Sequence, residues 1–142
     1  MSQSKNVSKN FGSVSSPSQF SKSGSLSHTM VTTTPAPTAL STSATTVTAS
    51  QVLAGVITQT PGSALTITLP AASTFVTAIP EAAVGDTFDF SVINLSSSNI
   101  ITIAVPGSGS LVGAAAVAVS TSAKFRVRIT AVGTAAYVLY RL

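Results

Sequence analysis

Residues 84–95 read Val-Gly-Asp-Thr-Phe-Asp-Phe-Ser-Val-Ile-Asn-Leu, and this stretch decides the fold class. After the opening turn, Phe88, Phe90 and Val92 recur at every second position. Successive side chains of a β-strand point to opposite faces, so residues two apart share a face. The pattern predicts a half-buried β-strand over Asp86–Leu95.

Short segments rich in Val, Ile, Leu and Thr, separated by Gly and Pro, surround this strand. We expect further strands over Val56–Thr60, Ala64–Leu69, Asn99–Val105, Ala114–Val119, Ala123–Ala131 and Ala135–Leu142. A capping-box pattern predicts one helical turn over Gln51–Gly55, and a stretch between two prolines predicts one short helix over Ala71–Ile79. Because strands and helices do not alternate regularly, we predict an all-β domain: a small antiparallel sandwich or barrel-like, jelly-roll or tulip-like fold.

The composition of the chain changes near residue 46. Residues 1–46 are rich in Ser and Thr and contain no acidic residue, and Pro35 and Pro37 favour a stiff, extended path over residues 31–46. We therefore predict an extended basic arm and linker, followed by a β domain over residues 47–142.

Apolar residues recur in the arm, although a pure spacer would not need them. One interpretation is that they are anchors that enter pockets on a partner as the arm becomes ordered, with lysines beside them. These residues are Phe11, Phe20, Leu26 and Met30, with Lys5, Lys9 and Lys22. The alternative is a solubilising tail.

The chain carries little charge: 7% of its residues are charged and 44% are hydrophobic, with a net charge of +4. Soluble monomers usually carry about 25% charged residues. A neutral surface of Ser, Thr and Ala suits packing against other subunits. Among the charges of the domain, we expect ion pairs between strands or between subunits from Asp86, Asp89, Arg126 and Arg128.

The sequence offers little for catalysis. It has no Cys, and its single histidine, His28, lies in the arm without a nearby carboxylate. Asp86 and Asp89 are three positions apart on a predicted strand and so face opposite sides, which does not make a carboxylate dyad. Metal sites need clustered ligands. We therefore expect no enzyme, no metal, no cofactor and no small-molecule substrate.

Other binding signatures are equally weak. Pro106–Ser110 is rich in Gly and Ser but lacks the Lys-Ser/Thr of a phosphate loop, so we interpret it as a hairpin loop. The longest apolar stretch, Leu111–Val119, is far shorter than the roughly 20 residues that span a bilayer, and residues 1–10 lack the apolar core of a signal peptide. Three arm lysines are too sparse to predict nucleic-acid binding.

The domain resembles a known family at four segments. They are Val84–Leu95, Leu111-Val112-Gly113, Phe125–Thr130 and Tyr137–Leu142. Together they look like the β domains of small capsid decoration, or cement, proteins of tailed bacteriophages, and they are also similar to knob domains of viral fibres.

The resemblance implies a non-catalytic virion protein on the outer surface of the capsid. In such families the β domain is commonly a trimeric knob, and an N-terminal arm lies along the lattice of the major capsid protein. The arm residues would then be the capsid anchors, and the homotrimer would stabilise the shell. The alternative is a receptor-binding head of a tail fibre or tail-tip protein.

Overall fold

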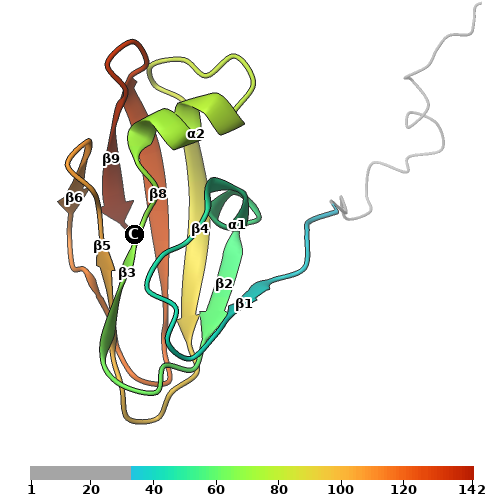
Figure 1. Ribbon diagram of the computed structural model, residues 1–142, viewed down its shortest axis with the longest axis vertical. Coiled ribbons are helices and arrows are strands. Elements are labelled where there is room, and N and C mark those ends of the chain that lie inside the picture. Colours follow the sequence, from blue (N-terminus) through green and yellow to red (C-terminus); the bar gives the residue numbers. More distant parts are fainter. Residues whose placement is uncertain (1–32) are drawn as a thin grey trace, which may run out of the picture. The chain divides into compact units, whose positions relative to one another are not determined.

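The computed structural model describes residues 33–142, of which Thr34–Leu142 form one compact unit. Within these residues the chain is predominantly β, with nine strands and two short helices (Figure 1). The strands are β1 (Thr38–Leu40), β2 (Val56–Gln59), β3 (Leu65–Thr68), β4 (Thr87–Asn94), β5 (Ile101–Ala104), β6 (Gly109–Val112), β7 (Ala116–Val117), β8 (Ser122–Ala131) and β9 (Ala136–Arg141). The helices are α1 (Ala49–Leu53) and α2 (Ala72–Ala78).

The strands form two sheets. A six-stranded sheet has the order β1-β2-β4-β8-β9-β6, and a three-stranded sheet has the order β3-β5-β7. In Figure 1 the six-stranded sheet lies behind, and the helices and the three-stranded sheet lie in front of it. The prediction of a β-rich domain is confirmed.

The prediction of an antiparallel fold is wrong in part, because both sheets are mixed. Four neighbouring pairs are parallel: β1 with β2, β2 with β4, β6 with β9, and β3 with β5. Only the pairs β4–β8, β8–β9 and β5–β7 are antiparallel. Parallel neighbours need crossover connections, which here contain α1, α2 or a strand of the other sheet.

Both helices lie close to the predicted positions. Thr48 caps α1: its hydroxyl accepts a hydrogen bond from the Gln51 backbone N–H at 3.2 Å, and the Gln51 side chain accepts one from the Thr48 backbone N–H at 2.8 Å. This reciprocal capping box satisfies two donors that a helix start otherwise leaves free. The second helix extends over Ala72–Ala78, inside the predicted stretch.

Two strands occupy segments that we did not predict to be strands. Strand β1 lies in the predicted linker and pairs with β2 from Thr38 to Leu40, so the ordered unit begins before residue 47. Strand β6 begins at Gly109, inside the predicted hairpin loop, and joins a different sheet from β5. The Pro106–Ser110 segment is therefore a crossover between sheets rather than a hairpin.

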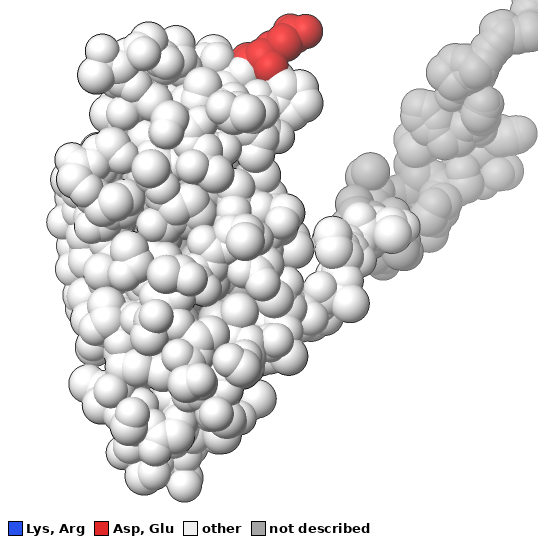
Figure 2. Space-filling model, viewed as in Figure 1, with Lys and Arg blue, Asp and Glu red and all other residues white. Residues whose placement is uncertain are grey.

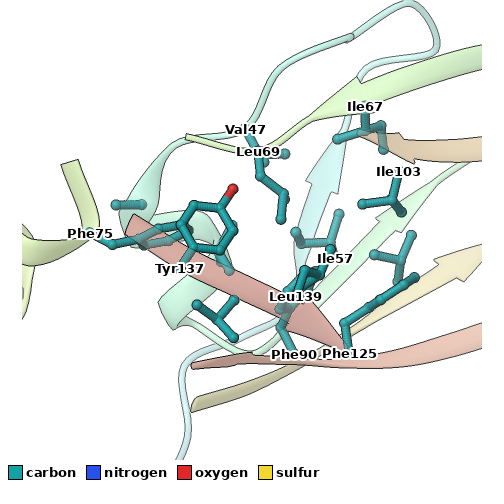
Figure 3. Close-up of a cluster of buried hydrophobic side chains, with 14 of the residues drawn as sticks. Val47, Ile57, Ile67, Leu69, Phe75, Phe90, Ile103, Phe125, Tyr137 and Leu139 are labelled. Atoms are coloured by element: carbon teal, nitrogen blue, oxygen red, sulfur yellow. The ribbon is translucent and has the colours of Figure 1, made fainter. Parts of the chain in front are cut away.

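One hydrophobic core lies between the two sheets and the helices (Figure 3). The predicted strand over Ala123–Ala131 is confirmed as β8, and its side chains alternate: Phe125, Val127 and Ile129 are fully buried, while the residues between them are exposed. Inward residues of the three-stranded sheet, such as Ile67 and Ile103, belong to the same core. The hydroxyl of buried Tyr137 donates to the Pro70 carbonyl at 3.2 Å.

Two buried side-chain amides, those of Gln59 and Asn94, form hydrogen bonds at the ends of β2 and β4. Asn94 is 1% exposed, and its Nδ2 donates to the carbonyls of Asn99 at 2.9 Å and Val117 at 3.1 Å. Its Oδ1 accepts a hydrogen bond from the Ser96 N–H at 3.0 Å. Gln59, its register partner on β2, donates to two carbonyls of the segment that leads into α1. Asn94 therefore joins β4 of the large sheet to β7 of the small one.

Candidate interaction face

The charges of the described domain gather on the outer face of the six-stranded sheet. Lys124, Arg126 and Arg128 lie at alternate positions of β8 and are exposed, because the residues between them fill the core. Asp89 lies on the neighbouring strand β4, directly opposite Arg126 in the antiparallel register.

Asp89 and Arg126 form a bidentate ion pair across the two strands. Arg126 Nε donates to Asp89 Oδ1 at 2.7 Å, and Nη2 donates to Oδ2 at 2.9 Å. Lys124 Nζ approaches the same carboxylate at 3.7 Å. The hydrogen bonds from Arg126 hold the pKa of Asp89 below its ordinary value, and those same bonds raise the pKa of Arg126. The carboxylate is therefore ionised at neutral pH and fixes the direction of the guanidinium.

The other two residues of the predicted ion-pair set have different roles. Asp86 precedes β4, where its Oδ2 accepts a hydrogen bond from the Ala83 N–H at 2.8 Å, so it stabilises a turn instead of a strand pair. Arg128 lies opposite Thr87, and no carboxylate of residues 33–142 pairs with it. The sequence prediction is confirmed for Asp89 with Arg126. Neither Asp86 nor Arg128 forms an ion pair within residues 33–142, and a role for them between subunits stays a prediction.

An apolar edge adjoins these charges. On β9, Tyr140 lies opposite Arg126 and Val138 lies opposite Arg128. On β6, Val112 pairs in register with Tyr140 and is 53% exposed. The sequence did not predict that Tyr140 lies beside the arginines.

The opposite side of the domain is different in character. Figure 2 shows no Lys or Arg on the side of the three-stranded sheet, and acidic colour only near the upper end. The remaining basic residue of the domain, Arg141, is used internally: its Nη1 donates to the carbonyls of Ala114 at 3.2 Å and Ala116 at 2.7 Å. The domain thus has one charged face and one nearly uncharged face.

Two shallow hollows lie at the ends of strands. One is lined by Ile93–Leu95 and Ser120–Ser122, and the other by Gly107–Ser110, Thr130 and Thr134–Val138. The only ionisable side chain lining either is Tyr137, which is buried, and burial raises its pKa. Among residues 33–142, no three His, Cys, Asp or Glu side chains come close enough to hold a metal ion.

The predicted arm residues lie outside the described part of the chain. They are Phe11, Phe20, Leu26, Met30, Lys5, Lys9 and Lys22, and their expected role as anchors stays a prediction. No helix in residues 33–142 is long and apolar enough to cross a membrane.

Comparisons of the chain with protein-family models, with curated proteins and with solved structures gave no match in any of the three. Any assignment of function therefore depends on the residues and the geometry described above.

Proposed function

We propose that this protein is a structural protein of a virion, a decoration protein that binds the outside of a major capsid lattice and stabilises the shell. The observation that carries the proposal is the division of the domain into a charged, partly aromatic face and a nearly uncharged face. Two surfaces of different character suit a module that contacts a shell on one side and neighbouring copies on the other. The sequence segments that resemble decoration proteins include β4, β8 and β9, which build the charged face.

The proposal includes a trimeric, sandwich-type knob. Uncharged surfaces of Ser, Thr and Ala favour association between copies because no like charges need to be brought together. Three arms on one trimer would bind a lattice much more tightly than one arm, since the second and third contacts form at high effective concentration. The arm residues Phe11 and Phe20 are the proposed anchors, and Lys5, Lys9 and Lys22 are the proposed surrounding charges.

Deletion of residues 1–30 tests the role of the arm. The truncated protein should keep its circular dichroism spectrum and thermal transition but lose its occupancy on undecorated capsids, measured by co-sedimentation. Phe11→Ser with Phe20→Ser should reproduce the loss, whereas Lys9→Gln should lower occupancy only slightly because one exposed charge contributes little. Equal occupancy of the full-length and truncated proteins would rule out the arm as the capsid anchor.

A second candidate is the receptor-binding head of a tail fibre or tail-tip protein. The connection between β4 and β5 favours it, because Leu95 and Ile100 are 58% and 43% exposed there. Exposed apolar side chains on a loop are typical of recognition surfaces. In that case Leu95→Ser would abolish attachment to host cells, and removal of the arm would not.

A further inference from the structure

We propose that the outer face of the six-stranded sheet binds an extended acidic segment of a protein partner, which lies along β8. We call Lys124, Arg126 and Arg128 the cationic row. The inference concerns the surface of the domain itself, so it goes beyond the capsid proposal and does not depend on the arm.

The spacing of the cationic row matches that of an extended peptide. Its members occupy every second position of one strand, and the rise of a strand is about 3.4 Å per residue, so neighbouring cations start about 7 Å apart. Acidic side chains at every second position of an extended partner have the same separation. One segment can therefore bring each carboxylate to one cation without changing its register.

The charge on this face is unbalanced. Three cations meet one carboxylate, Asp89, which Arg126 binds through two hydrogen bonds and Lys124 approaches. Arg128 is left without a carboxylate partner among residues 33–142. The side chains of Lys124 and Arg126 are still 58% and 47% exposed, so they can reach a second partner. A complementary ligand must be acidic, and its closest contact would be with Arg128.

The apolar edge adds contact area to the charges. Tyr140 flanks Arg126 on β9, and exposed Val112 flanks Tyr140 on β6. Tyr and Arg are enriched at the energetically important centres of protein interfaces. A partner with apolar side chains beside its carboxylates would cover this edge while its acids pair with the cationic row.

The face is better suited to a protein than to a nucleic acid. Proteins that bind duplex DNA through its backbone typically contact about 6–10 phosphates. The cationic row offers three charges, and Asp89 neutralises part of them. A carboxylate of the protein aimed at a phosphate backbone would also repel it, whereas an acidic peptide can place its acids at Arg128 and Lys124 and a neutral residue at Asp89.

The test uses the full-length protein and a fluorescein-labelled peptide of alternating Glu and Thr, followed by fluorescence anisotropy at low salt. Arg128→Gln should weaken binding about threefold, the usual effect of one exposed ion pair. Asp89→Asn should strengthen binding by a similar factor, because it releases Arg126 and Lys124 for the peptide. Gly107→Glu is the matched control: it lowers the net charge by one, as Arg128→Gln does, at an exposed position between β5 and β6 where a side chain meets open space, and it should leave the affinity unchanged.

Three results would overturn the proposal. The first is equal weakening by Arg128→Gln and Gly107→Glu, which would mean that only net charge matters. The second is a peptide with paired acids, Glu-Glu-Thr-Thr repeated at the same net charge, that binds as well as the alternating one. The third is a duplex DNA probe that binds more tightly than the peptide and loses affinity in Arg128→Gln, which would make the face a nucleic-acid site. Circular dichroism of each variant shows that its fold is intact.

Discussion

Replacement of Asn94 by Ala should be among the most destabilising single changes at a polar residue of the domain. The Asn94 side chain makes three hydrogen bonds to backbone groups of Ser96, Asn99 and Val117. A buried polar group that loses its partner costs about 1–3 kcal/mol. Water entering the vacated space would satisfy some of these groups, so we expect a loss of about 3–4 kcal/mol. Out of a total stability of about 5–15 kcal/mol, this is a large fraction.

Asn99→Ala is the matched control for this prediction. Asn99 is the same residue type five positions further on, but its side chain makes a single hydrogen bond, from Nδ2 to the Pro61 carbonyl at 3.0 Å. We expect a loss of about 1 kcal/mol. Urea unfolding followed by far-UV circular dichroism gives both free energies, and the thermal midpoint should fall by about 4 °C or more per kcal/mol. If Asn94→Ala were no more than about 1 kcal/mol less stable than Asn99→Ala, the claim that Asn94 fastens the two sheets together would be refuted.

Three further predictions concern single residues. Gly113 has φ +104°, and a Cβ added there would lie 2.7 Å from the Cβ of Arg141. Gly113→Ala should therefore lower the free energy of unfolding by about 1–3 kcal/mol in urea unfolding. The control is Gly107→Ala, which should be nearly neutral because a Cβ at Gly107 meets open space. Tyr137→Phe should cost about 1 kcal/mol at pH 7 through its lost hydroxyl hydrogen bond. Because burial raises the Tyr137 pKa, the native protein should lose stability as pH rises above about 10, and the Phe variant should lack that part of the decline. Folding lowers the pKa of Asp89, so its ion pair stabilises the domain above about pH 4 and this stabilisation is lost as the pH falls. Asp89→Asn should therefore be slightly less stable than the native protein at pH 7 and equally stable at pH 2. Thermal melts at the two pH values measure this difference.

The alternation of single strands could be predicted from the sequence, because it depends only on neighbouring residues. Phe90 on β4 and Val127 on β8 are buried as expected, and the capping box of Thr48 starts α1. Strand β1 could not be predicted in the same way. The two prolines before Thr38–Leu40 indicated an extended path, but the pairing of this segment with β2 is a contact between distant parts of the chain.

The arrangement of the candidate site depended on strand register. Asp89, Arg126 and Arg128 all point away from the core, so alternation alone allowed Asp89 to pair with either arginine. The register of β4 against β8 places Asp89 opposite Arg126 and Thr87 opposite Arg128. The position of Tyr140 beside Arg126 follows from the register of β9 in the same way. Alternation excludes a slip of one residue, which would move every side chain to the other face, but a slip of two residues keeps each side chain on its face, so alternation alone could not choose the partner of Asp89.

The copy number of this protein in purified virions tests the central proposal most directly. Quantitative mass spectrometry against the major shell protein would give the ratio of the two chains. A decoration protein predicts a ratio near one copy per shell subunit, or one trimer at each local three-fold position of the lattice. A dozen or fewer copies per particle would contradict the decoration proposal and favour a fibre head, and complete absence from virions would contradict both.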